Sequence, residues 1–96
     1  MALYVSLCNW TEQGIKNVKQ TIERVDAAKQ AGAKHGVKIR ETLYLMGQYD
    51  FLAVFEAPDE ATVSRFLLAV GMQGNVRSVT LRAFSVEEMQ GIVSKL

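Results

Sequence analysis

Apolar and polar residues alternate over residues 2–8, a pattern that predicts a β-strand with Leu3, Val5 and Leu7 on one face. Residues 37–45 and 51–56 are two further apolar runs, rich in β-branched and aromatic side chains, and this composition favours strands. Residues 76–84 have the same character. The sequence therefore predicts four strands, and the middle two are close enough to form a hairpin.

The hairpin is centred on Gly47-Gln48, which we expect to form a two-residue type II′ turn because glycine readily adopts a positive φ. In that register Tyr44 pairs with Phe51, and Thr42 pairs with Ala53. A bulge or a one-residue slip would turn the side chains of one strand to the opposite face.

Two stretches between the strands have the three-to-four-residue apolar spacing of amphipathic helices. The first begins after Thr11 and the second after Asp59, both of which are good N-cap residues. Gly14, in the first turn, is expected to allow close approach of another backbone. The inward residues are expected to be Ile15, Val18, Ile22 and Val25 in the first helix and Val63, Phe66, Leu67 and Val70 in the second. Ser85 and Glu88 form a capping box that starts a short tail helix.

The order strand, helix, strand, strand, helix, strand and tail helix indicates one domain over residues 1–96. Two right-handed crossovers joined by a hairpin build a four-stranded antiparallel sheet with two helices on one face. The predicted fold class is therefore α+β, a ferredoxin-like βαββαβ sandwich with a short C-terminal helix.

Helices on one side leave the other face of the sheet uncovered. We expect the aliphatic side chains to face the helices, namely Leu3, Val5, Leu7, Ile39, Leu43, Leu52, Val54, Val79 and Leu81. The uncovered face would then carry Tyr4, Ser6, Cys8, Arg40, Thr42, Tyr44, Phe51, Phe55, Ser78, Thr80 and Arg82. A face with so many aromatic residues predicts an interface, either with a second copy or with the tail helix.

The net charge and the cysteine and histidine content indicate which classes of partner and ligand to expect. The net charge is +1, and acidic residues are interspersed among the lysines, so we expect no nucleic-acid partner. No apolar run approaches the length of a membrane span, and a cytoplasmic protein without a membrane partner is the expectation. Cys8 and His35 are the only residues of their types, so neither a disulfide, a metal site nor a bound cofactor is predicted.

The candidate ligand-binding residues are those of the predicted uncovered face. Arg40 and Arg82 would lie there among hydroxyl groups, an environment that suits a carboxylate or a planar anion. The accompanying candidates are Tyr4, Thr42, Tyr44 and Thr80. The alternative is that each arginine forms a salt bridge with an acidic residue of a partner chain.

Tyr49 and Asp50 also allow two interpretations. A phenol beside a carboxylate can exchange protons with a substrate, whereas a carboxylate near a turn commonly accepts backbone N–H groups. Adjacent strand residues point to opposite faces, which favours the structural role.

The segment Gly47-Gln48-Tyr49-Asp50 resembles the Gly-x-Tyr-Asp signature of the GYD-domain family. Residues 11–17, 56–60, 74–77 and 80–84 are similar to other stretches of that family. The resemblance implies a dimeric α/β-barrel type of assembly, in which two such sheets face each other. It implies no established catalytic residues. Gly47, Tyr49 and Asp50 are the residues of the family motif, and we interpret them as structural because a carboxylate near a turn commonly accepts backbone N–H groups.

Three functions remain open from the sequence. The first is a homo-oligomer that binds a small organic ligand at the sheet face between subunits. The second is a cofactor-independent enzyme of the dimeric α/β-barrel type acting on a small aromatic or oxygenated compound. The third is a structural or regulatory subunit. A closed cavity lined by Arg40, Tyr44 and Arg82 would favour the first two, and a dry interface would favour the third.

Overall fold

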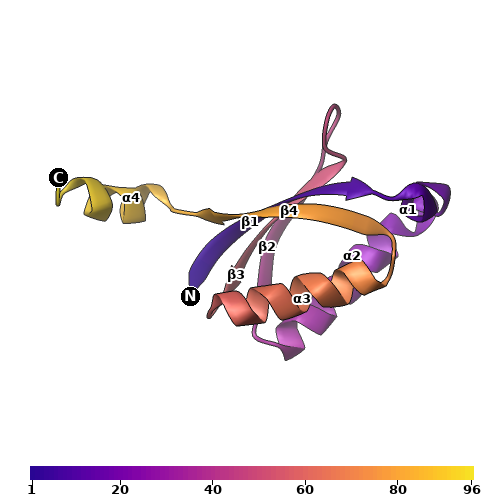
Figure 1. The fold of residues 1–96 in the computed structure, drawn as a ribbon, viewed down its shortest axis with the longest axis horizontal. Coiled ribbons are helices and arrows are strands. Elements are labelled where there is room, and N and C mark those ends of the chain that lie inside the picture. Colours follow the sequence, from indigo (N-terminus) through magenta and orange to yellow (C-terminus); the bar gives the residue numbers. More distant parts are fainter.

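A computed structural model describes residues 1–96, and it confirms the four-stranded antiparallel sheet with helices. The elements are β1 (Ala2–Trp10), α1 (Glu12–Lys16), the 3₁₀ turn η1 (Val18–Gln20), α2 (Thr21–Lys34), β2 (Lys38–Tyr44), β3 (Phe51–Ala57), α3 (Glu60–Met72), β4 (Val76–Ala83) and α4 (Val86–Val93). The strand order β2-β3-β1-β4 is the ferredoxin-like order, with every neighbouring pair antiparallel. Helices α2 and α3 lie on one side of the sheet, and α4 projects away from it (Figure 1).

The predicted helix starts are confirmed, but the first helix is not continuous. The Thr11 hydroxyl accepts a hydrogen bond from the Gly14 N–H, and the Asp59 carboxylate accepts one from the Thr62 N–H. The chain then leaves helical geometry at Asn17 and passes through η1 before α2 begins. The prediction that Ile15 and Ile22 face the sheet is wrong, because the two residues are 50% and 60% exposed.

The hairpin register is confirmed from residue 41 to residue 54, including the pairs Tyr44–Phe51 and Thr42–Ala53. A β-bulge at Arg40 then shifts the pairing, so that Ile39 rather than Arg40 lies opposite Phe55. The predicted two-residue turn is wrong, because the strands end at residues 44 and 51 and a six-residue loop joins them. Gly47 does adopt the expected positive φ within that loop.

The two faces of the sheet are the reverse of those predicted, except at Ile39, which packs against the core on the helix side as expected. The core beneath the helices contains Tyr4 and Phe55 from the sheet and Phe66 from α3. The Tyr4 and Phe55 rings stack with centroids 5.6 Å apart, and Phe66 meets Phe55 edge-on at 6.0 Å. Small side chains share this face, among them Ser6 and Ala57, and these leave room for the aromatic rings and the helices. The aromatic face is therefore the covered one.

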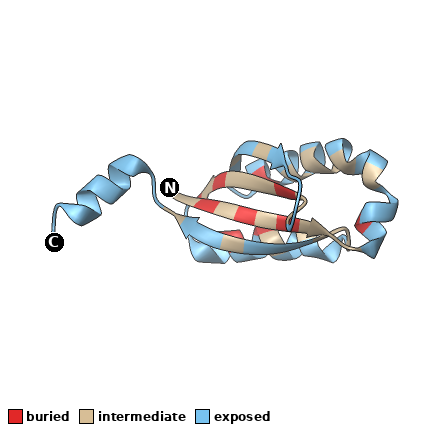
Figure 2. Ribbon diagram, turned by 90° about the horizontal axis from the view of Figure 1, so that it is seen from above, coloured by how far each residue is buried: buried red, intermediate tan, exposed pale blue.

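The aliphatic face is correspondingly open. Residues on this face alternate with the buried ones along β1 and β3, as the burial colours of Figure 2 show. Its side chains are Leu3, Val5, Leu7, Leu43, Leu52, Val54, Val79 and Leu81, and we refer to them as the open aliphatic face. Helix α4 does not cover it, because every residue from 84 to 96 is exposed (Figure 2).

Candidate functional site

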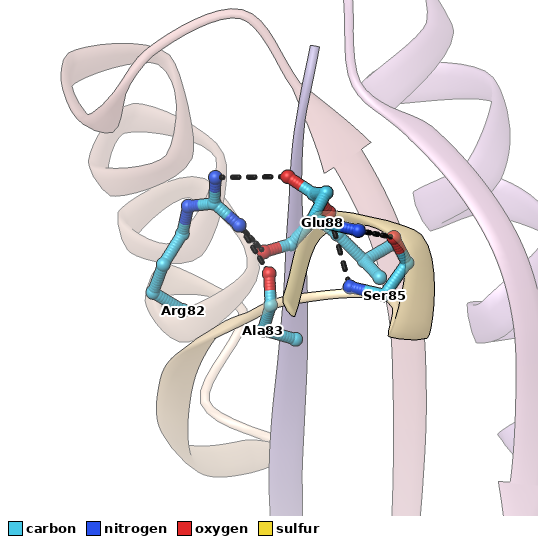
Figure 3. Close-up of polar contacts among 5 residues, drawn as sticks. Arg82, Ala83, Ser85 and Glu88 are labelled. Carbon is cyan, nitrogen blue, oxygen red and sulfur yellow. Dashed lines mark hydrogen bonds and ion pairs between the residues drawn. The ribbon is translucent and has the colours of Figure 1, made fainter. Parts of the chain in front are cut away.

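Arg82 lies on the edge strand β4, where it ties the base of α4 to the sheet. Its guanidinium donates hydrogen bonds to the carbonyl oxygens of Leu3 and Ala83 and lies 3.7 Å from the Glu88 carboxylate (Figure 3). It also stacks over the Phe84 ring, 4.5 Å from the centroid. Because these contacts engage most of its donors, Arg82 serves here as an anchor for the chain entering α4.

The capping box that starts α4 is present as predicted. The Ser85 hydroxyl accepts from the Glu88 N–H at 3.1 Å, and the Glu88 carboxylate accepts from the Ser85 N–H at 3.0 Å. The backbone hydrogen bond from Ser85 lowers the pKa of Glu88, and the charge of Arg82 adds to the effect. These contacts fix the direction in which α4 leaves the sheet.

Arg40 lies at the opposite edge of the sheet, on β2. Its guanidinium contacts the Glu56 carboxylate at 2.8 Å. Strands β3 and β1 stand between Arg40 and Arg82, so the structure does not bring the two arginines together. The expectation that they line one anion-binding cleft is wrong, because the sheet order places their strands on its two outer edges.

The other four ligand-binding candidates belong to the helix side of the sheet. Tyr4 is part of the core, and the Thr80 hydroxyl lies 2.6 Å from that of Ser6. The Tyr44 hydroxyl lies 3.2 Å from that of Thr21 at the start of α2. Their predicted place on the uncovered face is therefore wrong, for the same reason that the two faces were interchanged.

Thr42, the last of these candidates, also faces the helices. It pairs with Ala53, and its hydroxyl oxygen is buried without a hydrogen-bond partner. The indole nitrogen of Trp10 is also buried without a hydrogen-bond partner. The Trp10 ring packs against the rings of Tyr44 and Phe51, with centroid distances of 6.4 and 6.1 Å. Unpaired polar atoms of this kind are uncommon inside proteins.

The Gly-x-Tyr-Asp segment attaches the β2–β3 loop to the end of β1. The Asp50 carboxylate accepts a hydrogen bond from the Trp10 N–H at 2.9 Å, and the Asp50 N–H donates to the Cys8 carbonyl at the same distance. Asn9 donates to the Gln48 carbonyl at 2.8 Å. These bonds continue the pairing of β1 with β3 beyond its last residue pair, Cys8–Phe51, and they give Asp50 a backbone-binding role. A chemical role for the Tyr49 and Asp50 pair stays a prediction.

The open aliphatic face is a candidate interaction surface that the sequence did not predict, because these side chains were expected to face the helices. Leu43, Val79 and Leu81 remain 46%, 51% and 50% exposed, and five further aliphatic side chains lie beside them. The signal was present in the sequence, because both faces of the predicted sheet are apolar. The pattern alone does not reveal which apolar face the crossover helices cover.

Two further properties of the chain bear on the kind of site. No three His, Cys, Asp or Glu side chains gather closely enough to hold a metal ion. None of the helices combines the length and the apolar character that crossing a bilayer requires.

An antiparallel sheet with helices on one face and an uncovered apolar face defines a ferredoxin-like α+β protein. The chain belongs to the GYD domain family, whose model matches residues 4–93. It is 31% identical over 90 residues to a Thermus thermophilus protein named glutamine synthetase and cystathionine beta-lyase binding protein, covering 93% of this chain and 95% of that one.

A crystal structure of a chlorite dismutase-like protein has a similar fold. The TM-score is 0.57 and the sequence identity is 16%, and the likeness covers 97% of this chain. The chain spans 48% of the length of that protein, and at 16% identity the likeness is one of fold alone.

Proposed function

We propose that the chain is a self-associating, protein-binding module in which the open aliphatic face meets the same face of a second copy. The observation that carries this proposal is the exposure of Leu43, Val79 and Leu81 on the one face of the sheet that no helix covers (Figure 2). Removing apolar surface from water contributes about 25 cal/mol per Å². Contiguous aliphatic surface of this kind marks interaction sites in other proteins.

Helix α4 supports the same proposal. It has eight residues, and isolated helices shorter than about 12 residues are marginal in water. Its apolar residues Met89, Ile92 and Val93 follow helical spacing and are all about half exposed. Because α4 projects away from its own sheet, a second copy is the surface that would bury this stripe (Figure 1).

The Thermus thermophilus relative suggests the kind of further partner. Its name states that it binds glutamine synthetase and cystathionine beta-lyase. We extend that property to this chain as a regulatory or scaffolding subunit that binds metabolic enzymes. Pairing through the open aliphatic face would leave the outer surfaces of α2 and α3 available to such an enzyme, because these helices lie on the opposite side of the sheet.

Self-association is tested by sedimentation velocity on Leu81→Lys and on Ile22→Lys as a matched control. The two wild-type residues are 50% and 60% exposed, but only Leu81 lies on the open aliphatic face. In a symmetric pair the lysine appears twice, and an unpaired buried charge costs several kcal/mol. We expect Leu81→Lys to raise the dissociation constant at least about 100-fold and Ile22→Lys to leave it unchanged. A monomeric wild-type chain at micromolar concentration would refute the proposal.

Partner binding is tested with purified glutamine synthetase and cystathionine beta-lyase from the organism that encodes this chain. We expect at least one enzyme to co-elute with the wild-type chain in size-exclusion chromatography. Failure of both enzymes to bind at tens of micromolar would remove the partner assignment while leaving the self-association result intact.

A further inference from the structure

A cavity of about 80 Å³ lies between the sheet and the helical layer. Its floor is formed by strand residues that include Phe51 and Phe55, and its walls include Ala28 of α2 and Leu67 of α3. Eleven of its fifteen lining residues are hydrophobic. This cavity is on the covered side of the sheet, so it is separate from the proposed self-association surface.

The polar groups in the cavity wall are all uncharged. Thr42 lines the cavity, and its hydroxyl oxygen is buried without a partner. Ser6 and Ser78 also line the cavity, and the Ser6 hydroxyl already forms a hydrogen bond with the Thr80 hydroxyl. A buried hydroxyl without a partner is unfavourable, so a ligand that supplies one hydrogen-bonding group would relieve this cost.

The only lining side chain that could take on a charge is the Cys8 thiol. Burial raises the pKa of this thiol to about 11, so it stays neutral at physiological pH. Neither Arg40 nor Arg82 is among the lining residues. A charged ligand would therefore lose its hydration without gaining a counter-charge.

We propose that this cavity binds a small, uncharged and largely apolar molecule that carries one hydroxyl or carbonyl group directed to Thr42. An apolar cavity of about 150 Å³ in another protein accommodates benzene. The present cavity is about half that size, so it sets an upper limit of one small ring, which would enter only in part or after a small shift of the lining side chains. The arrangement thus selects for shape and for a single polar group rather than for charge.

The test uses three probes that share one ring: benzene, phenol and benzoate. Each is titrated into the full-length protein at millimolar concentrations, and amide chemical shifts are followed by NMR. We expect saturable shifts for benzene and phenol at residues that line the cavity. We expect benzoate to bind at least about tenfold more weakly, because its charge finds no partner in the cavity.

Two substitutions locate the bound probe. Ala28→Leu fills the cavity, whereas Ala27→Leu adds the same side chain on the exposed side of α2. We expect Ala28→Leu to weaken phenol binding at least about tenfold and Ala27→Leu to leave it unchanged. Thr42→Val keeps the side-chain shape and removes the hydroxyl, so it should weaken phenol about twofold to tenfold and spare benzene.

Three results would overturn the proposal. The first is an absence of saturable shifts with both neutral probes. The second is benzoate binding as tightly as phenol. The third is unchanged selectivity for phenol over benzene in Thr42→Val, a near-isosteric variant that keeps the proposal testable if Ala28→Leu fails to fold. None of these results depends on the oligomeric state or on an enzyme partner, so they are distinguishable from failure of the proposed function.

Discussion

Replacing Gly14 by alanine should destabilise the protein even though alanine is the better helix former. Gly14 lies in α1, where its backbone touches the loop that connects α3 to β4. A Cβ atom at this position would lie 2.0 Å from the carbonyl oxygen of Asn75 and 2.9 Å from its carbonyl carbon. Both neighbours are backbone atoms, so no side-chain rotation relieves the overlap.

The magnitude follows from how firmly Asn75 is held. Its carbonyl accepts a hydrogen bond from the Thr11 N–H at 3.0 Å, and Gln13 adds a hydrogen bond to the Asn75 side chain. Separating the new Cβ from the oxygen by about 1 Å would break the Thr11 hydrogen bond, at a cost of about 1 kcal/mol. Overpacking adds a further cost of about 1–3 kcal/mol. The higher helix propensity of alanine offsets about 1 kcal/mol of this destabilisation. We expect Gly14→Ala to lower the free energy of unfolding by about 2 kcal/mol in total.

The assay is thermal unfolding by circular dichroism, with Gly71→Ala as the control. Gly71 lies in α3, and a Cβ there meets no atom within 4 Å. We expect the Tm of Gly14→Ala to fall by roughly 8–16 °C and that of Gly71→Ala to rise by roughly 2–8 °C. A Tm of Gly14→Ala equal to or above that of the wild type would refute the argument from close approach.

Three further predictions concern charge and reactivity. The Thr62 backbone hydrogen bond lowers the pKa of Asp59, so Asp59 stabilises the fold above its ordinary pKa and loses this contribution as the pH falls through the lowered value. The stability advantage over Asp59→Asn should therefore shrink in urea titrations between pH 5 and pH 2, and a constant difference would contradict this. Cys8 should resist thiol reagents at pH 8 until the protein unfolds, and rapid labelling of the folded chain would show that burial does not protect it. Arg82→Met should speed proteolysis between residues 84 and 86 without changing the global urea midpoint, since it releases only the base of α4; an unchanged cleavage rate would count against the anchor.

Local signals in the sequence were sufficient to predict the elements and much of the pairing. Thr11, Asp59 and Ser85 each cap the helix expected of them, because capping depends on residues only three positions apart. The pairs from Tyr44–Phe51 to Glu41–Val54 also follow the expected register. The sequence allowed a bulge in the hairpin as an alternative to regular pairing. It did not show that a bulge occurs at Arg40, because a strand with one extra residue has the same apolar and β-branched character as a regular one.

The candidate site depended on information that is not local. Placing Tyr4 on the open face required knowing which side the helices cover, and both sides of β1 are apolar enough for either outcome. Bringing Arg40 and Arg82 together required two edge strands to be neighbours, which the sheet order excludes. The cavity beside Thr42 arises from the fit between helices and sheet, and no sequence spacing encodes such a gap.

The bulge at Arg40 also limits the ways in which copies of this chain can assemble. Strand β2 is an edge strand, and an edge with regular unpaired N–H and C=O groups invites another strand to extend the sheet without end. The extra residue interrupts that regular row, and the ion pair between Arg40 and Glu56 places charges beside it. Growth along the hydrogen-bonding direction is thereby discouraged on this side. Contact between sheet faces produces closed assemblies of defined size, whereas strand addition at this edge would lead toward fibres.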